Sequence, residues 1–197
     1  GSNNCTLDPV HVLIEAIKGG ITFFQFREKG VGSYKGKAKR ELAQELQTIC
    51  KLYDIPFIVN DDIDLALELN ADGVHIGQED GLVSETRKRI GKMILGVSAH
   101  NVAEARKAIV DGADYLGVGP MYDTDTKKDI REVKGPKVIE DIRKSGIAIP
   151  IVGIGGITNV NAKEIIDAGA DGVAVISSIS QADSPRQAAR KLLCTIK

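Results

Sequence analysis

Short runs of apolar residues alternate along the chain with longer stretches in which apolar residues recur about every 3.6 positions. Continuous apolar runs are typical of parallel strands that are covered on both faces. They predict strands at residues 21–26, 57–60, 73–77, 94–98, 115–119, 149–155 and 172–177. The periodic stretches predict helices at residues 9–18, 36–53, 62–70, 82–90, 101–111, 136–145, 159–168 and 185–196.

Three segments resemble one another: DLALELNADGVHIG, EARKAIVDGADYLGVG and AKEIIDAGADGVAVIS. Each reads as the end of an amphipathic helix, a link of Asn or Gly followed by Ala-Asp, and an apolar strand. Asn or Gly ends a helix well because it tolerates a positive φ. One αβ unit at three places indicates a repeated βα architecture.

The predicted elements begin with a helix and include one more helix than strand. We therefore expect an α/β protein with a (β/α)8 TIM barrel whose first strand is missing from this chain. Residues 1–197 would form one domain, since about 200 residues is the lower end for this fold. An open doubly wound sheet is the alternative, and it is less favoured because no GxGxxG turn is present.

The composition excludes several classes of protein. Hydrophobic residues make up 43% and charged residues 27%, as in globular proteins, and the net charge of −1 argues against nucleic-acid or anionic membrane partners. No apolar stretch approaches the ~18 residues that cross a bilayer. Cys5, Cys50 and Cys194 are far apart and lack metal-ligand spacing, which favours a reducing, cytoplasmic location. The oligomeric state stays open, with a homo-oligomer among the alternatives.

Charged and hydroxyl residues gather just after the predicted strands, where parallel barrels carry their catalytic groups. Gln25, Arg27 and Lys29 alternate along the first strand and its extension, so they would share one face. Two cations and an amide on one face could hold a diphosphate and read the edge of a ring. The alternative is a strand end that frays into solvated charge.

Two acidic residues stand just past the ends of neighbouring strands of the predicted barrel. Asp61 follows the strand at 57–60, and Asp80 follows the strand at 73–77. Adjacent strands lie about 4.8 Å apart, so both carboxylates could reach one ion. Oxygen ligands without a His or Cys cluster suit Mg²⁺. The alternative for Asp61 is to cap the helix that begins near Asp62.

Three further segments indicate phosphate binding. The loop GPMYDTDTKKD carries hydroxyls and lysines and could form a lid over phosphates, although an ordinary charged surface loop would look similar. The segments IVGIGGI and AVISS follow the last two strands, where such barrels often bind phosphate through backbone N–H groups. Gly155 and Gly156 would allow close approach to a ligand, or they form a structural turn. His75 lies inside a strand and is expected to be a packed core residue more often than a ligand.

The blocks QFREK, IVNDDIDLALELNADGVHIGQED, GVSAH, ADYLGVGPMYDTDTKKD, IVGIGGI and GVAVISSI occur in this order between residues 25 and 179. Together they resemble the thiamine phosphate synthase family. The resemblance implies a (β/α)8 barrel and a Mg²⁺-dependent transferase with two small-molecule substrates. It would join 4-amino-2-methyl-5-(diphosphooxymethyl)pyrimidine to 4-methyl-5-(2-phosphooxyethyl)thiazole, giving thiamine phosphate and diphosphate.

The resemblance also implies roles for individual residues. The pyrimidine diphosphate would be bound by Gln25, Arg27, Lys29, Asn60, Ser98 and Lys127. Of these, the catalytic residues would be Arg27, Lys29, Ser98 and Lys127. Asp61 and Asp80 would bind Mg²⁺. The thiazole phosphate would be bound by Thr124, Thr126, Gly156, Ile176 and Ser177. The chain departs from the family at two points: the first barrel strand is missing, and Asp123 stands where the family often has Pro.

The chemistry that the family implies agrees with these residues. The C–O bond to diphosphate breaks first, and the thiazole nitrogen captures the resulting pyrimidine-methyl cation. Such a reaction needs neutralised charge and positioned rings more than acid–base groups. Two rival hypotheses are a thiazole tautomerase-like relative, which needs neither diphosphate nor metal, and a non-catalytic sensor of thiamine precursors. Asp61, Asp80, Lys127 and QFREK together favour the synthase over the tautomerase.

Overall fold

The computed structural model describes residues 1–124 and 132–197, so Thr126 and Lys127 lie outside the described residues. The described chain divides into two compact units. Unit 1 consists of residues 1–75 and 176–194, and unit 2 consists of residues 76–175 and 195–197. The expectation of one domain over the whole chain stays a prediction.

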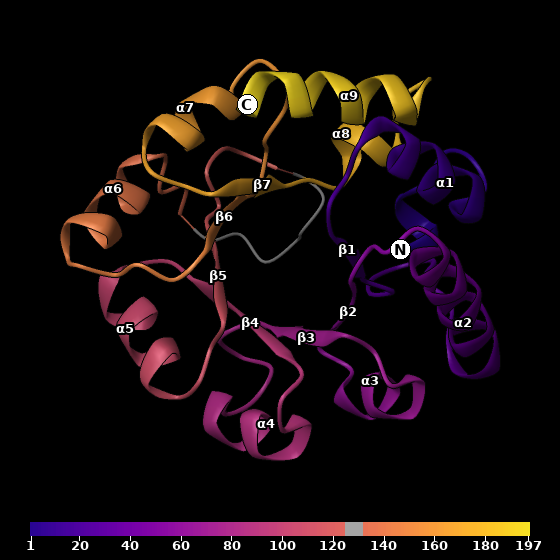
Figure 1. Ribbon diagram of the computed structural model, residues 1–197, viewed down its shortest axis with the longest axis horizontal. Helices are drawn as coiled ribbons and strands as arrows, with labels where there is room; N and C mark the ends of the chain where they lie inside the picture. Colours follow the sequence, from indigo (N-terminus) through magenta and orange to yellow (C-terminus); the bar gives the residue numbers. More distant parts are fainter. Residues whose placement is uncertain (125–131) are drawn as a thin grey trace. The chain divides into compact units, whose positions relative to one another are not determined.

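Unit 1 holds three parallel strands together with helices that come before, between and after them in the chain (Figure 1). Phe24 of the first strand lies opposite Phe57 of the second, and Asn60 of the second lies opposite His75 of the third. The elements are η1 (Ser2–Asn4), α1 (Pro9–Gly19), β1 (Phe24–Phe26), α2 (Gly36–Leu52), β2 (Phe57–Asn60), α3 (Ile63–Leu69), β3 (Gly73–Ile76), α8 (Ser177–Ser180) and α9 (Pro185–Ile196). The last residue of β3 and the last two of α9 belong to unit 2.

Unit 2 holds four parallel strands that alternate with helices. The elements are α4 (Val83–Ile90), β4 (Ile94–Ala99), α5 (Val102–Val110), β5 (Tyr115–Val118), α6 (Lys137–Lys144), β6 (Ile151–Ile154), α7 (Ala162–Asp167) and β7 (Gly172–Ala174). In both units the strands neighbour one another in chain order, as they do in a TIM barrel. The order never reverses, as it would at the switch point of a doubly wound sheet. The predicted α/β fold of the (β/α)8 class is therefore confirmed, and no strand precedes β1 in the described residues.

Several predicted boundaries were wrong for identifiable reasons. The strand predicted at 21–26 begins only at Phe24, because the residue before β2 is Pro56, whose carbonyl accepts the Phe24 N–H at 3.1 Å but which has no N–H of its own to donate. The strand predicted at 149–155 begins after Pro150, which has no N–H to donate to a neighbour. The strand predicted at 172–177 ends at Ala174, and Ser177 instead opens the short helix α8.

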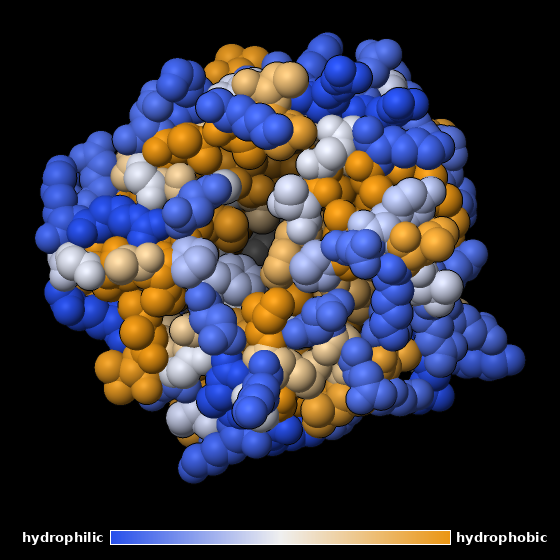
Figure 2. Space-filling view, in the orientation of Figure 1, coloured by the Kyte–Doolittle hydropathy of each residue, from blue (hydrophilic) through white to orange (hydrophobic). Residues whose placement is uncertain are grey.

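The core of each unit is built on the apolar strands. In unit 1, Phe57, Ile58 and Val59 are fully buried, as a strand covered on both faces requires. Gly19 lets α1 approach α9 closely, since a Cβ at this position would lie 2.5 Å from the Arg186 carbonyl oxygen. Hydrophilic residues cover the outward side of helices such as α2 (Figure 2). Among the described residues, no helix is both long and apolar enough to span a membrane.

The same type of hydrogen bond occurs in all three predicted αβ links. In each, the Asp of the Ala-Asp pair accepts the backbone N–H at the start of the preceding strand: Asp72 from Phe57, Asp114 from Leu95 and Asp171 from Ile151, all at 2.8 Å. The residue that ends each helix has a positive φ, as the sequence predicts, at Asn70 (49°), Gly112 (103°) and Gly169 (105°). These links therefore tie consecutive strands together at their amino ends.

Two arginines reinforce the links of unit 2 in the same way. Arg143 donates to the carbonyl oxygens of Gly169, Ile147 and Ile149 at 2.8, 3.1 and 2.8 Å, and it forms an ion pair with Asp171. Arg87 makes the equivalent bonds to Gly112, Gly91, Met93 and Asp114. In unit 1 a neutral side chain takes this place: the Gln47 amide donates to the Leu69 carbonyl at 2.9 Å.

Candidate active site

The end of β1 presents the predicted diphosphate residues on one side and apolar or buried residues on the other. Gln25 and Arg27 are half-buried, and Lys29 is exposed. Phe26 and Glu28, the residues between them, are only 1% and 9% exposed. This alternation continues past the end of the strand, so Gln25, Arg27 and Lys29 follow the alternating pattern that the sequence predicts.

Glu28 is a buried carboxylate that organises the loop after β1. Its oxygens accept hydrogen bonds from the Ser2 backbone N–H at 2.8 Å, the Ser2 hydroxyl at 2.5 Å and the Tyr34 backbone N–H at 2.7 Å. The side chain of Asn3 donates to the Lys29 carbonyl oxygen at 3.1 Å. The segment from Ser2 to Asn3 thus fastens the loop that carries Arg27 and Lys29.

We expect Glu28→Gln to weaken the binding of inorganic diphosphate by about tenfold and to lower the free energy of unfolding by about 1–3 kcal/mol. The amide retains one acceptor oxygen, but its NH₂ group would face a donor that the carboxylate now satisfies. Calorimetric titration and urea unfolding would measure the two effects. Glu45→Gln, at an exposed position on α2, is the matched control. Wild-type affinity in the Glu28 variant would contradict a positioning role.

The end of β2 carries Asn60, Asp61 and Asp62, three polar residues in direct succession. Asp61 has a φ of 62° and is held there by two backbone bonds: its N–H donates to the His75 carbonyl at 2.9 Å, and its own carbonyl accepts from Ile63 at 3.0 Å. The predicted alternative that Asp61 caps the next helix is wrong. Asp62 is the N-cap of α3, where its carboxylate accepts the Leu65 N–H at 3.0 Å.

A separate lysine neutralises each of these two neighbouring carboxylates. Lys29 lies 2.7 Å from Asp61, and Lys39 of α2 lies 2.6 Å from Asp62. Burial raises the pKa of the Asp62 carboxyl, but the hydrogen bonds from Lys39 and the Leu65 amide, with the Lys39 charge, leave this pKa below its ordinary value of 3.8. Opposite charges thus allow two adjacent acids at one strand end.

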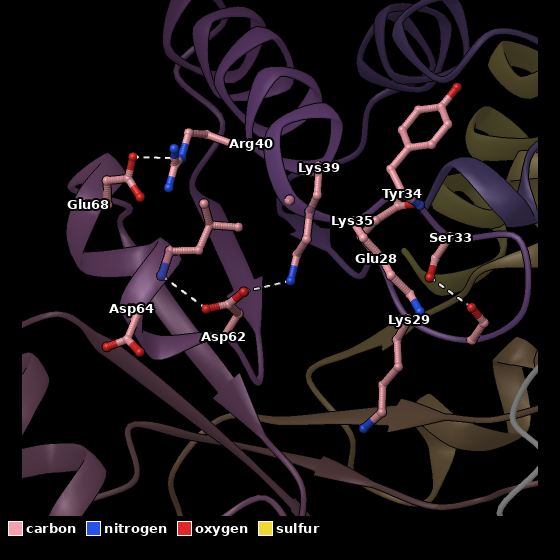
Figure 3. Close-up of a pocket in the computed structure, with 13 residues that line it drawn as sticks. Glu28, Lys29, Ser33, Tyr34, Lys35, Lys39, Arg40, Asp62, Asp64 and Glu68 are labelled. Carbon is pink, nitrogen blue, oxygen red and sulfur yellow. Dashed lines mark hydrogen bonds and ion pairs between the residues drawn. The ribbon is translucent and has the colours of Figure 1, made fainter.

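A pocket of about 570 Å³ lies in unit 1 between the loop after β1, α2 and the start of α3. Figure 3 shows Lys39 and Asp62 pointing toward each other, and Arg40 paired with Glu68 at 2.8 Å. The Lys29 side chain extends away from these two pairs (Figure 3). Two ion pairs, Lys39–Asp62 and Arg40–Glu68, therefore line one side of the pocket. Lys29 pairs with Asp61 at the end of β2.

Unit 2 carries the other described strand-end residues. Ser98, 7% exposed, lies in β4, and its carbonyl oxygen accepts from the Gln78 amide at 2.6 Å. The Asp80 carboxylate accepts the Gly77 N–H at 2.9 Å, which closes the turn after β3. Asp61 belongs to unit 1 and Asp80 to unit 2, so their convergence on one ion stays a prediction.

The glycines after β6 are both structural and close to a predicted binding segment. Gly155 and Gly156 have φ values of 90° and 65°. A Cβ at Gly156 would lie 2.6 Å from the carbonyl oxygen of Asp123, the residue before Thr124. The backbone of the loop after β5 therefore packs directly on this turn, and Thr124 is the residue that follows this contact.

Ile176 and Ser177 lie in unit 1, at the start of α8. The other end of α8 contacts the N-terminal segment, where the Ser180 hydroxyl donates to the Asn4 carbonyl at 2.7 Å. The roles that the sequence predicts for Ile176 and Ser177 stay predictions. His75 is 6% exposed in β3, in agreement with a packed residue of the strand.

The structure thus brings Gln25, Arg27, Lys29, Asn60 and Asp61 to the adjacent ends of β1 and β2. Sequence reasoning missed Glu28 and Lys39. Glu28 occupies the buried side of an alternating pattern, and a charge at such a position is a usable signal. Lys39 left no signal, because its partner Asp62 is 23 residues away.

Comparison with known proteins is consistent with this arrangement. Residues 1–179 match the family model described as thiamine monophosphate synthase. A thiamine-phosphate synthase of Bacillus cereus (strain B4264) is 57% identical over 197 residues, which cover 100% of this chain and 90% of the relative. A thiamine-phosphate synthase of Bacillus velezensis is 59% identical over 191 residues, 97% of this chain and 85% of the relative. The solved structure of a thiamine phosphate pyrophosphorylase from Pyrococcus furiosus superposes with a TM-score of 0.85 at 34% identity, covering 95% of this chain and 89% of that one.

Proposed function

Because the chain belongs to the thiamine monophosphate synthase family, we propose that it makes thiamine phosphate from its two precursors. It is a transferase that acts on small molecules. The proposed substrates are 4-amino-2-methyl-5-(diphosphooxymethyl)pyrimidine and 4-methyl-5-(2-phosphooxyethyl)thiazole, called here the pyrimidine diphosphate and the thiazole phosphate. Diphosphate is the second product.

The observation that supports this function best is the ion pair at the ends of β1 and β2. Lys29 and Asp61 come from neighbouring strands and meet at 2.7 Å, with Arg27 two residues before Lys29. Two cationic side chains at the carboxyl ends of parallel strands, one of them paired with a carboxylate, suit a substrate that arrives as a polyanion. A tautomerase acting without a diphosphate would have no use for this set.

In the proposed reaction the C–O bond between the pyrimidine methylene and diphosphate breaks first. Its bonding electrons leave with the diphosphate, whose growing charge Arg27 and Lys29 would stabilise. Ser98 and Lys127 are proposed to act with them. The thiazole nitrogen then donates its lone pair to the methylene cation and forms the new C–N bond. Binding of both substrates by their phosphates holds the two rings in register, which removes most of the entropic cost of their encounter.

The donor set fits Mg²⁺, for which we propose Asp61 and Asp80 as ligands. Within residues 1–124 and 132–197, no group of three or more His, Cys, Asp or Glu side chains could hold a metal. Magnesium commonly binds through one or two carboxylates, with water and substrate phosphate as its other ligands. When bound, it would supply positive charge to the leaving diphosphate.

The thiazole phosphate is proposed to bind through Thr124 and Gly156 of unit 2, and through Thr126, Ile176 and Ser177. Gly156 supports this proposal because its φ of 65° and its contact with the Asp123 carbonyl exclude a side chain there. A backbone without side chains is what a phosphate group needs for close approach to N–H donors.

A pyrophosphate-release assay with both substrates, with and without Mg²⁺, tests the proposed function. We expect release only when both substrates and Mg²⁺ are present. Conversion of a thiazole carboxylate phosphate without diphosphate or metal would favour the tautomerase hypothesis. Binding of either substrate without turnover would favour the sensor hypothesis, and both results contradict a synthase.

The location and assembly of the protein are also proposals. All three cysteines are free thiols, which supports a cytoplasmic location. The homo-oligomer among the predicted alternatives stays a prediction.

A further inference from the structure

Tyr122 lies at the root of the loop after β5, two residues before Thr124. Its backbone N–H donates to the Gly155 carbonyl at 3.1 Å, and the preceding residue, Met121, donates to Ile154 at 2.9 Å. A Cβ at Gly156 would lie only 2.7 Å from the Tyr122 Cβ. The root of the loop is therefore seated on the turn that follows β6.

The Tyr122 side chain extends this contact to helix α7. Its hydroxyl donates to a Glu164 carboxylate oxygen at 2.8 Å and lies 3.4 Å from the Asn161 carbonyl oxygen. Burial, followed by the hydrogen bond to Glu164, raises the pKa of Tyr122 from its ordinary value of 10 to about 12, in agreement with a hydroxyl that acts as a hydrogen-bond donor. We call this contact the Tyr122–Glu164 latch.

The turn under the latch is itself braced. The Asn161 amide donates to the Gly156 carbonyl at 3.1 Å, and its oxygen accepts the Thr158 N–H at 2.8 Å. The latch therefore connects the loop root to a turn whose shape is held by two hydrogen bonds of Asn161. Gly156 lies inside this braced turn.

The next residue of the loop gives it no rigidity of its own. Asp123 is exposed, so its side chain is not packed in a core. The loop root is held instead by the backbone bonds of Met121 and Tyr122 to the turn after β6 and by the Tyr122 side chain.

We propose that Tyr122 and Glu164 are positioning residues for the thiazole phosphate. Their latch holds the loop root against the braced turn, so that Thr124 and Gly156 meet the phosphate with a preformed geometry. In this proposal neither residue touches the reacting atoms. The inference rests on the proposed function, because that function assigns Thr124 and Gly156 to this substrate.

Tyr122→Phe tests the latch, since it removes only the hydroxyl. We expect KM for the thiazole phosphate to rise about 3- to 10-fold, as befits one lost hydrogen bond, with kcat and KM for the pyrimidine diphosphate changed less than about twofold. Glu164→Ala should have the same effect, and Glu164→Gln, which keeps an acceptor oxygen, should restore most of the affinity. The double variant Tyr122→Phe/Glu164→Ala should be no worse than either single variant, because both remove one interaction.

Lys163→Gln is the matched control, because it breaks an exposed ion pair with Asp167 on the same helix and leaves Tyr122 in place. It should leave KM unchanged for both substrates. A wild-type KM for the thiazole phosphate in Tyr122→Phe would overturn the latch, as would an equal rise for both substrates or a Glu164→Gln variant as poor as Glu164→Ala.

Calorimetric titration of the thiazole phosphate separates failure of the latch from failure of the proposed function. An active wild type whose Kd for the thiazole phosphate is the same as that of Tyr122→Phe overturns the latch alone. A wild type that releases no diphosphate refutes the proposed function; if it still binds the thiazole phosphate, a weaker Kd in Tyr122→Phe supports the latch. A wild type that neither turns over nor binds the thiazole phosphate overturns both.

Discussion

Replacing Asp61 by Asn should lower kcat by about 100-fold or more and raise the Mg²⁺ concentration needed for half-maximal activity. A metal that stabilises a leaving group is worth several kcal/mol, and about 1.4 kcal/mol is a factor of ten in rate. The substitution removes the negative charge that pairs with Lys29 at 2.7 Å and that we propose as a ligand of Mg²⁺. Pyrophosphate release measured across a Mg²⁺ titration gives both quantities.

Asparagine is the right replacement because of the backbone at this position. Asp61 has a φ of 62°, a conformation that Asn tolerates and that costs most other residues about 1–2 kcal/mol. Loss of activity in Asp61→Asn would therefore not come from a strained strand end, and urea unfolding should stay within about 1 kcal/mol of wild type. Asp64→Asn, at an exposed position in the first turn of α3, is the control. Full activity of Asp61→Asn at the same low Mg²⁺ would contradict the metal assignment.

Replacing Arg143 by Met should lower the free energy of unfolding by about 2–4 kcal/mol while leaving KM for both substrates unchanged. The guanidinium donates to three carbonyl oxygens and pairs with Asp171, so its loss leaves several half-buried acceptors without a donor. Met keeps most of the apolar stem, so the effect reports the lost polar contacts. The contacts lie at the amino ends of β6 and β7, where parallel barrels carry stability and not catalysis.

Urea unfolding followed by circular dichroism measures this effect, and Arg106→Met supplies the comparison. Arg106 is an exposed arginine of the neighbouring α5 whose guanidinium donates to the Ser145 carbonyl oxygen at 2.7 Å. We expect Arg106→Met to lower the free energy of unfolding by less than about 0.5 kcal/mol. A similar small loss in Arg143→Met would show that the arginine does not stabilise the link between the strands.

The Tyr122–Glu164 latch and the hydrogen bonds of Glu28 have the same proposed role. In each case, the loop that carries predicted binding residues is held by a neighbouring residue that is not itself predicted to bind substrate. Glu28 fastens the loop of Arg27 and Lys29 to Ser2, and Tyr122 fastens the loop of Thr124 to α7. Preformed loops reduce the ordering cost of binding, which is why we expect their loss to change affinity more than chemistry.

The features that the sequence predicted correctly depend on interactions between residues that are close together in the chain. Short apolar runs such as 57–59 are typical of buried strands, and a positive φ at Asn70, Gly112 and Gly169 follows from how these residues end helices. The alternation along and after β1 likewise predicted that Gln25, Arg27 and Lys29 share one face. The α/β alternation, the barrel class and the strand-end location of the polar residues needed no long-range information. The resemblance then assigned them to a family.

Tertiary structure alone decided the pairs that brace these residues. Lys39 meets Asp62 across 23 positions and Tyr122 meets Glu164 across 42, and neither pair leaves a periodic trace in the chain. The structure also decided that Asp62, and not Asp61, caps α3, and that Ser177 opens a helix of four residues with no side-chain cap. A local pattern records which face of an element is buried, because burial repeats with the period of that element. A single polar contact between distant elements happens once, so only the folded chain can show it.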